Sequence, residues 1–374
     1  MSVKLILVAG ARPNFVKIAP VWFEINNSYL KWKTIILHTG QHYDYEMSRA
    51  FFEDLDLPKP DYFLGVGSGT HAEQTAKTMI EFEKVLRQEK PALVVVFGDV
   101  NSTLACSVTA KKLMIPVAHV EAGLRSFDIS MPEEINRKLT DSISDILLTP
   151  SKDANDNLVR EGVGLDKIHF VGNIMIDSLM KILEKVDTFD EEKILKRFGL
   201  QAGNYTLVTL HRPSNVDNKD KLWRILELLN NLSKRIPVIF PVHPRTRKKL
   251  DEFGSDLSFD GELRITEAFR YKEFIILEKK AKCVITDSGG IQEETTYLDI
   301  PCLTLRPNTE RPVTITEGTN ELVALEEIEE KMRLILSRNW KQGKIPALWD
   351  GKTAKRIVDV FEKIDFQNND FTRF

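Results

Sequence analysis

Short, near-continuous apolar segments recur along the whole chain, and most lead through a polar or glycine-containing turn into a helical pattern. Segments of this length that are apolar on both faces are typical of strands in a parallel sheet with helices on both sides. The N-terminal half carries them at residues 3–9, 33–38, 92–97, 115–120, 146–151 and 167–171, and the C-terminal half at 205–210, 238–241, 263–265, 283–286 and 301–305. The alternation predicts an α/β protein with two doubly wound parallel sheets.

The length of 374 residues suits two domains better than one. Gly172 and Asn173 mark the expected boundary, so residues 1–172 and 173–352 should form one domain each. We expect residues 353–374 to form a C-terminal helix and tail that pack back on the N-terminal domain.

The composition excludes several classes of protein. A net charge of −3 implies no nucleic-acid partner. No apolar run reaches the roughly 18–20 residues that a membrane span needs. The three cysteines lie far apart in apolar surroundings and lack metal-ligand spacing, which favours reduced core thiols. We therefore expect a cytoplasmic protein that binds no membrane and holds no metal.

Two carboxylates stand where buried strands should end in the N-terminal half. Asp99 follows the apolar run 92–97, and Glu121 follows 115–120. Ligands of parallel sheets bind outside the carboxyl ends of the strands, so the two side chains should lie near one site. Pro132 suits the first position of the next helix, where Glu133 and Arg137 share a face. The same residues also fit a helix cap at Asp99 and an ordinary surface pair of Glu133 with Arg137.

The first strand leads through Gly10 and Pro13 into a helix that carries Lys17 in its first turn. A strand, a glycine turn and a helix together offer backbone N–H groups to an anion, and Arg12 and Lys17 add positive charge there. The spacing matches neither a dinucleotide-binding loop nor a P-loop. A solvated helix lysine is the alternative for Lys17.

The best phosphate signal of the C-terminal half is the sequence DSGG at 287–290. Gly289 and Gly290 let the backbone of a helix start approach a diphosphate, and Ser288 can donate a hydrogen bond. Glu294, one turn further on, can accept hydrogen bonds from a pair of hydroxyls such as a ribose diol. A plain N-cap at Ser288 with a solvated Glu294 is the alternative.

His211 directly follows another buried strand, where it could donate to a phosphate or shuttle a proton. The C-terminal half therefore offers a diphosphate site, and the N-terminal half offers carboxylates. If the two domains share one cleft, they suit a nucleotide-sugar, with the sugar near Asp99, Glu121 and Glu133. Several carboxylates beside a sugar allow a proton to be removed from one face and returned to the other.

Eight motifs, in order, resemble the non-hydrolysing UDP-N-acetylglucosamine 2-epimerases of bacteria and archaea. The resemblance runs from the first strand to about Val323. The motifs are GARPNFVK (10–17), GDVNSTLA (98–105), HVEAGLRS (119–126), PEEINR (132–137), LHRPSNVD (210–217), PVHPRT (241–246), TDSGGIQEE (286–294) and ERP (310–312).

The resemblance implies a glycosyltransferase-B type fold of two Rossmann-like domains with the active site between them, usually as a homodimer. It implies interconversion of UDP-GlcNAc and UDP-ManNAc without NAD or metal, through elimination of UDP to a 2-acetamidoglucal and re-addition. By the family's pattern the diphosphate contacts are Arg12, His211, Ser288, Gly289 and Gly290, with Glu294 on the ribose, Phe274 on the uracil and Arg311 on the nucleotide. The residues that match the family's catalytic group around the sugar are Lys17, Asp99, Glu121, Glu133 and Arg137. By the same resemblance, His211 would help the diphosphate to leave.

Three alternatives stay open at this point. Relatives with similar motifs act on UDP-2,3-diacetamido-2,3-dideoxy-glucuronic acid, whose carboxylate would call for an extra cation near the sugar. A glycosyltransferase on the same fold would need an acceptor groove. A silent nucleotide-sugar binding protein would have no need of several carboxylates.

Overall fold

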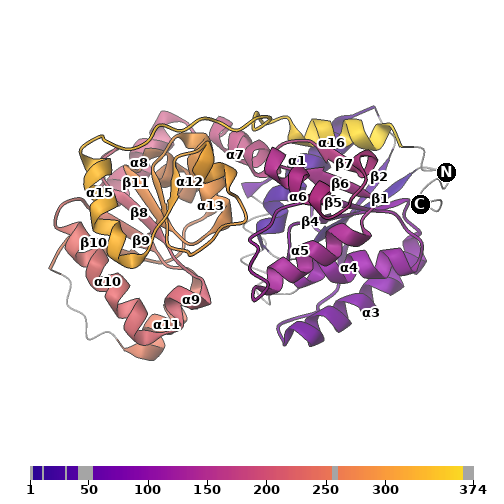
Figure 1. Cartoon of the computed structure of the whole chain (residues 1–374), viewed down its shortest axis with the longest axis horizontal. Helices are drawn as coiled ribbons and strands as arrows, with labels where there is room; N and C mark the ends of the chain where they lie inside the picture. Colours follow the sequence, from indigo (N-terminus) through magenta and orange to yellow (C-terminus); the bar gives the residue numbers. More distant parts are fainter. Residues whose placement is uncertain (1–2, 11, 30–31, 41–53, 255–259, 365–374) are drawn as a thin grey trace. The chain divides into compact units, whose positions relative to one another are not determined.

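The computed structural model describes residues 3–10, 12–29, 32–40, 54–254 and 260–364, and it divides the chain into two compact units (Figure 1). The first unit is Met1–Met180 with Ala347–Phe374, and the second is Lys181–Pro346. The first division falls inside helix α7 (Ile174–Glu184), later than the expected boundary after residue 172. The beginning of α7 belongs to the first unit because Ser178 donates its hydroxyl hydrogen to the carbonyl of Val16 there.

The first unit is built on a seven-stranded sheet in which all paired strands are parallel. The strand order is β3-β2-β1-β4-β5-β6-β7. The strands are β1 (Lys4–Ala9), β2 (Lys33–His38), β3 (Tyr62–Phe63), β4 (Leu93–Phe97), β5 (Val117–Val120), β6 (Ile146–Thr149) and β7 (Ile168–Phe170). Because the chain runs outward in both directions from β1 and β4, the ligand-binding crevice of such a sheet lies at the carboxyl ends of these two strands.

The helices of the first unit cover this sheet and are mostly amphipathic. Its described helices are α1 (Arg12–Asn27), α3 (His71–Glu89), α4 (Asn101–Lys112), α5 (Pro132–Ile143), α6 (Lys152–Arg160), a 3-10 turn η1 (Leu165–Lys167), the beginning of α7, and α16 (Thr353–Glu362). Pro132 occupies the first position of α5, as the sequence predicted. The interior is dominated by fully buried valine, isoleucine and leucine side chains of the strands.

The C-terminal helix α16 packs against α1 in the first unit (Figure 1). The residue at its N-cap, Lys352, provides no side-chain cap. Asp177 of α7 supplies the missing acceptor, since its carboxylate accepts from the backbone N–H of Thr353 at 3.1 Å and of Ala354 at 2.7 Å. The first turn of a helix always leaves backbone N–H groups without an intrahelical partner, so this contact fixes where α16 begins.

The second unit repeats the architecture with a six-stranded sheet whose pairs are again all parallel. Its strand order is β10-β9-β8-β11-β12-β13, so the order reverses between β8 and β11. The strands are β8 (Thr206–Thr209), β9 (Val238–Pro241), β10 (Leu263–Thr266), β11 (Cys283–Thr286), β12 (Cys302–Thr304) and β13 (Asn320–Leu322). The crevice of this sheet is therefore expected at the carboxyl ends of β8 and β11.

Helices surround the second sheet as well, and its largest buried cluster lies between α10, α15 and the strands. The described helices are the end of α7, α8 (Thr188–Arg197), α9 (Pro213–Val216), α10 (Lys219–Ser233), α11 (Pro244–Phe253), α12 (Tyr271–Lys280), α13 (Gly289–Leu298), α14 (Val313–Thr316), the 3-10 turn η2 (Leu325–Glu327) and α15 (Ile328–Leu336).

The prediction of two doubly wound parallel sheets is confirmed. The sequence reading missed the two edge strands β3 and β13, which are only two and three residues long. It also missed α6 and α11, which follow strands without a wide apolar stripe of their own. Among the described residues, every helix is too short or too polar to serve as a membrane span.

Candidate active site

In the first unit the backbone turns sharply after β4 and β5, and both turns have positive φ angles. Gly98 has φ +66° and Glu121 has φ +72°. A Cβ atom on Gly98 would lie 3.0 Å from Lys17 Nζ and 3.4 Å from Glu121 Oε2. Glycine suits this position for two reasons. It adopts the left-handed backbone conformation without strain, and it leaves room for the Lys17–Glu121 pair. A left-handed glutamate is uncommon and costs strain, which is typical of functional sites.

Lys17 and Glu121 form an ion pair between α1 and the end of β5. The two residues are only 8% and 4% exposed. The ion pair uses Oε2 of Glu121, whereas the buried Oε1 has no hydrogen-bond partner among the described residues. Buried polar atoms are almost always satisfied, so an orphaned carboxylate oxygen at a strand end indicates a place for a ligand. This contact excludes the solvated-lysine alternative for Lys17.

Asp99 does not cap the helix that follows it. The N-cap of α4 is Val100, without a side-chain hydrogen bond. The carboxylate of Asp99 instead pairs with Arg137 Nη1 of α5 at 2.5 Å. The side-chain amide of Asn136 donates to the backbone carbonyl of Asp99 at 2.9 Å. Helix α5 thus holds both the side chain and the backbone of Asp99.

Glu134 belongs to this group, although the sequence pattern pointed to its neighbour Glu133 as the site residue. It is 2% exposed and pairs with Arg137 Nη2 at 2.7 Å. It also accepts from the backbone N–H groups of Ser126 at 2.9 Å and Phe127 at 3.0 Å. Burial opposes its ionisation, but these hydrogen bonds and Arg137 hold the pKa of Glu134 below its usual value. Glu133, its neighbour, stands half-buried in the first turn of α5.

Behind the strand ends lies a second buried network that the sequence reading did not assign. The ring nitrogens of His119 lie 2.6 Å from Asp141 Oδ1 and 2.8 Å from the Gly98 carbonyl oxygen. Asp141 also pairs with Arg125 at 2.7 Å and accepts from the Gly123 N–H at 3.0 Å. The network ties the turns after β4 and β5 together. Its signal in the sequence is a histidine inside an otherwise apolar strand.

In the second unit the start of α13 has the features expected of an anion site. Ser288 is the N-cap residue, but its hydroxyl makes no cap hydrogen bond. The alternative of a plain N-cap through the Ser288 side chain is therefore wrong. A Cβ atom on Gly289 would lie 2.5 Å from Arg311 Nη1. An arginine therefore stands directly beside the helix N-terminus, with Gly290 in the same first turn. Arg311 is itself paired with Glu310 and, at 2.8 Å, with Glu293.

Asp287 connects this helix start to the predicted site histidine. Its fully buried carboxylate accepts from the backbone N–H groups of His211 at 3.1 Å and Arg212 at 2.9 Å, and from Asn215 Nδ2 at 3.0 Å. His211 Nδ1 lies 3.2 Å from the same carboxylate. Burial opposes ionisation, but these contacts, with His211 foremost, keep the pKa of Asp287 below its usual value. The ends of β8 and β11 are thereby joined at the point where the strand order reverses.

Glu294 lies on α13, one turn beyond the glycines, and is 2% exposed. It is not solvated, because Tyr271 of α12 donates its hydroxyl hydrogen to Glu294 Oε1 at 2.7 Å. Burial raises the pKa of Glu294 to about 7, although the hydrogen bond from Tyr271 works against the shift. Phe274, on the same helix as Tyr271, packs against a buried cluster that includes Leu277 and Ile291.

The structure thus brings Lys17, Asp99, Glu121 and Arg137 to one edge of the first sheet. It brings His211, Ser288, Gly289, Gly290 and Arg311 to the corresponding edge of the second. Helix α1 begins at Arg12, whose side chain lies outside the described residues. Two Rossmann-like domains, one with buried carboxylates and one with a cationic helix start, define an enzyme of the glycosyltransferase-B fold class.

Comparison with known proteins identifies the family. The sequence model of the UDP-N-acetylglucosamine 2-epimerase family matches residues 25–362. The UDP-N-acetylglucosamine 2-epimerase of Methanocaldococcus jannaschii is 44% identical over 365 residues, which cover 96% of this chain and 98% of that protein. Its crystal structure in complex with UDP-GlcNAc and UDP matches with a TM-score of 0.87, covering 96% of this chain and 99% of that one.

A relative from Pseudomonas aeruginosa, a UDP-2,3-diacetamido-2,3-dideoxy-D-glucuronate 2-epimerase, is 40% identical over 371 residues and covers 96% of this chain and 100% of that protein. This chain belongs to the UDP-N-acetylglucosamine 2-epimerase family and is an epimerase, a type of isomerase. The glycosyltransferase and silent-binding alternatives are thereby set aside.

The carboxylate of Asp287 should be essential to the second unit. We expect Asp287→Asn to lower the free energy of opening around β8 and β11 by about 2–4 kcal/mol. An amide keeps one acceptor oxygen but turns an NH₂ group toward buried N–H donors. Hydrogen exchange of peptides covering these strands measures the effect.

Asp299→Asn is the matched control. Asp299 is exposed at the other end of α13 with φ +57°, a left-handed conformation that asparagine tolerates well. The control should stay within about 0.5 kcal/mol of the wild type. Equal exchange rates in the two variants would show that Asp287 does not hold the strand ends.

Proposed function

We propose that the protein catalyses the reversible C2 epimerisation of UDP-GlcNAc to UDP-ManNAc. The observation that carries the proposal is Glu121 in the first unit. Its carboxylate is held by Lys17 through one oxygen, while the other is buried without a partner among the described residues. A fixed, dry carboxylate oxygen is suited to exchange a proton with a carbon acid.

The reaction we propose proceeds by elimination and re-addition. A base takes the proton from C2, the C1–O bond breaks with its electron pair leaving on the diphosphate, and a C1–C2 double bond forms. In reverse, a proton is delivered to the opposite face of C2 while a diphosphate oxygen attacks C1. Asp99, Glu121 and Glu133 are the candidates for the two proton transfers, with Lys17 and Arg137 holding two of them.

The nucleotide contacts would come from the second unit. The N-terminus of α13 with Ser288, Gly289 and Gly290 presents backbone N–H groups, and Arg311 and His211 add positive charge. These groups would stabilise the negative charge that develops on the departing diphosphate, which lowers the barrier rather than only tightening binding. Phe274 would form part of the uracil pocket and Glu294 would accept from the ribose. Arg12, which belongs to the first unit, would add a further diphosphate contact.

A neutral acetamido sugar fits better than a uronic acid. Three cations among the described side chains around the strand ends of the first unit already face carboxylates: Lys17 faces Glu121, Arg137 faces Asp99 and Glu134, and Arg125 faces Asp141 and Glu161. A carboxylate at sugar C6 would have to displace one of them. The M. jannaschii relative, which binds UDP-GlcNAc, supports the same choice.

The product UDP-ManNAc would feed a surface polysaccharide. The expected compartment is the cytoplasm, where thiols such as the buried, unpaired Cys106, Cys283 and Cys302 remain reduced.

Proton NMR in deuterated buffer tests the reaction directly. With UDP-GlcNAc and the enzyme we expect the C2 proton signal to disappear while UDP-ManNAc signals grow, because deprotonation exchanges the C2 proton with solvent. Accumulation of free UDP and ManNAc would instead show a hydrolase. No change in UDP-GlcNAc together with exchange in UDP-2,3-diacetamido-glucuronic acid would reassign the substrate.

Glu121→Gln should abolish C2 exchange and leave the dissociation constant for UDP within about twofold of wild type, since Glu121 serves the sugar. A loss on the order of 10²–10⁴-fold in exchange is expected for removal of a general base. Glu83→Gln, at a partly exposed glutamate of α3 in the first unit, is the control and should exchange normally. A comparable loss of UDP affinity in Glu121→Gln would assign Glu121 to the nucleotide instead.

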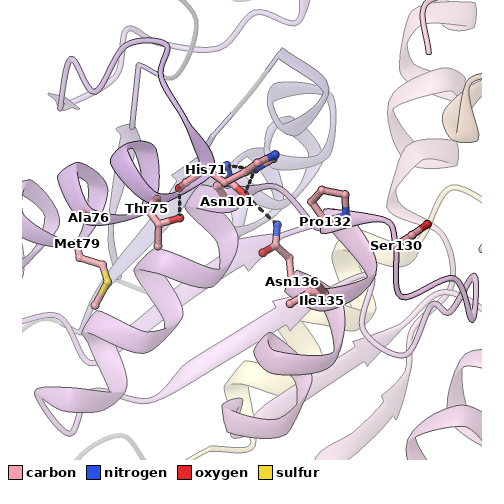
Figure 2. A pocket seen from close by; sticks show the side chains of 10 residues that line it. His71, Thr75, Ala76, Met79, Asn101, Ser130, Pro132, Ile135 and Asn136 are labelled. Atoms are coloured by element: carbon pink, nitrogen blue, oxygen red, sulfur yellow. Dashed lines mark hydrogen bonds between the residues drawn. The ribbon is translucent and has the colours of Figure 1, made fainter. Parts of the chain in front are cut away.

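The proposed enzyme is a homodimer, and an apolar face of the first unit supports this. Helices α3 and α5 expose large apolar side chains, with Ile80 58%, Ile135 42% and Leu139 47% exposed. A hollow of about 520 Å³ lies between these helices and is lined by Met79 of α3, Pro132 and Ile135 among others. Figure 2 shows these lining side chains. Exposed apolar side chains around an apolar hollow are typical of protein interfaces, and a second copy is the partner we propose.

Ile135→Asp should therefore shift the protein from twice the chain mass of 42.8 kDa toward the single-chain mass in sedimentation equilibrium, because a charge would be desolvated in the interface. Phe189→Asp is the control, since Phe189 of α8 is 71% exposed and lies in the second unit. A wild-type protein that sediments as a monomer would remove the proposal.

A further inference from the structure

The second unit contains a buried acidic cluster that no step above uses in full. Glu294 is 2% exposed and Glu278, on α12, is fully buried. Tyr271 of the same helix donates to Glu294 Oε1 at 2.7 Å. Two carboxyl groups and a phenol thus meet where α12 and α13 pack together, close to the predicted ribose contact.

No cation among the described residues is hydrogen-bonded to Glu278. Both of its carboxylate oxygens lack a hydrogen-bond donor among the described residues. Burial and the charge of Glu294 raise the pKa of Glu278 well above its usual value. A protonated Glu278 gains a hydrogen that it can donate to Glu294, which turns a repulsive pair into a hydrogen bond.

We propose that Tyr271 and Glu278 are positioning residues for Glu294 and fix the carboxylate that accepts hydrogen bonds from the ribose diol of the nucleotide. The inference rests on the proposed UDP-sugar function. A carboxylate offers about four lone-pair sites, so the contacts with Tyr271 and Glu278 leave sites for two hydroxyl donors. Ordering the acceptor in advance reduces the entropy that ligand binding would otherwise cost.

The arrangement also sets how binding depends on pH. Ribose hydroxyls donate best to an ionised carboxylate, so the ribose contribution should be present above the Glu294 pKa of about 7 and fade as the pH falls through it. Removing the Tyr271 hydroxyl removes a donor that favours the ionised form. The pKa of Glu294 then rises, and the fading should begin at a higher pH.

Other charged or titratable groups surround Glu294. Glu293 of α13 acts on Glu294 directly. The remaining charged or titratable groups on elements packed against α13 are Cys283 of β11, Cys302 of β12, Arg311 before α14, Glu321 of β13, and Lys272, Glu273, Lys279 and Lys280 of α12. Burial raises the pKa of the Cys302 thiol to about 12 and that of Cys283 well above its usual value. Arg311 is held by Glu293, and Glu321 by Lys331.

The test compares the affinity of the full chain for UDP with that for 2′-deoxy-UDP by calorimetry between about pH 5.5 and 8.5. The dissociation constant for 2′-deoxy-UDP divided by that for UDP isolates the contribution of the ribose 2′-hydroxyl, because titration of the diphosphate affects both ligands alike. A larger ratio means a stronger ribose contact. At pH 7 we expect Tyr271→Phe to reduce this ratio about three- to tenfold, as for loss of one hydrogen-bonding partner, and to recover part of it at the highest pH.

Glu278 is tested with two replacements. Glu278→Gln keeps a donor toward Glu294 and should keep the ratio of the two dissociation constants within about twofold of wild type. Glu278→Met fills a similar volume without a donor and should lower the ratio as Tyr271→Phe does. Tyr297→Phe is the control. Tyr297 is the tyrosine of α13, and its replacement should leave the ratio unchanged.

If Tyr271→Phe lowers the affinity for UDP and for 2′-deoxy-UDP equally, Tyr271 has a merely structural role and the inference is overturned. An unchanged ratio in Tyr271→Phe would overturn it too, as would a loss in Glu278→Gln as large as in Glu278→Met. Glu294→Gln separates this failure from failure of the proposed function. If that variant loses the ratio while Tyr271→Phe does not, the ribose site stands without its positioning residues. If the wild type does not bind UDP, the proposed function itself fails.

Discussion

The buried ion pair between Lys17 and Glu121 is the contact on which the first unit's site depends. Desolvating a carboxylate at a strand end is costly unless a cation meets it, and Lys17 reaches it from the first helix. The pair lies directly against Gly98, where a Cβ atom would approach Lys17 Nζ to 3.0 Å. The glycine after β4, the glutamate after β5 and a lysine of the first helix therefore specify a single arrangement of charges.

The same constraint is met differently in the second unit. There the buried carboxylate of Asp287 is satisfied by backbone and amide N–H groups and by His211 rather than by a lysine. Its carboxylate oxygens hold His211 and Arg212, which follow β8, beside the start of α13. The cationic groups are thereby left around the helix N-terminus, where an anion is favoured. The two domains share a fold but use their strand ends for opposite charges.

The sequence was sufficient for the fold and for naming candidate site residues at the strand ends, because both follow from local patterns. Apolar runs locate the strands, and the residue after each run locates Asp99, Glu121 and His211. What it could not supply is the pairing, which depends on helix phase and tertiary contacts. Glu133 and Glu134 are neighbours in the same acidic turn, yet it is Glu134 that is buried against Arg137. Asp287 was read as part of a phosphate turn, and its role as an acceptor appears only once β8 and β11 are adjacent.

The acidic cluster around Glu294 follows from the same limits. Glu278 lies in the sequence LEKK (277–280), whose three consecutive charged residues are typical of a surface segment. Nothing local indicates that its side chain is fully buried. A buried, unpaired acid would destabilise the domain if it stayed ionised, so the proton it retains is part of the structure. A group that is costly for folding is thereby placed where it can order an acceptor for the ligand. Departures from good core chemistry of this kind are expected where selection has acted on binding rather than on stability.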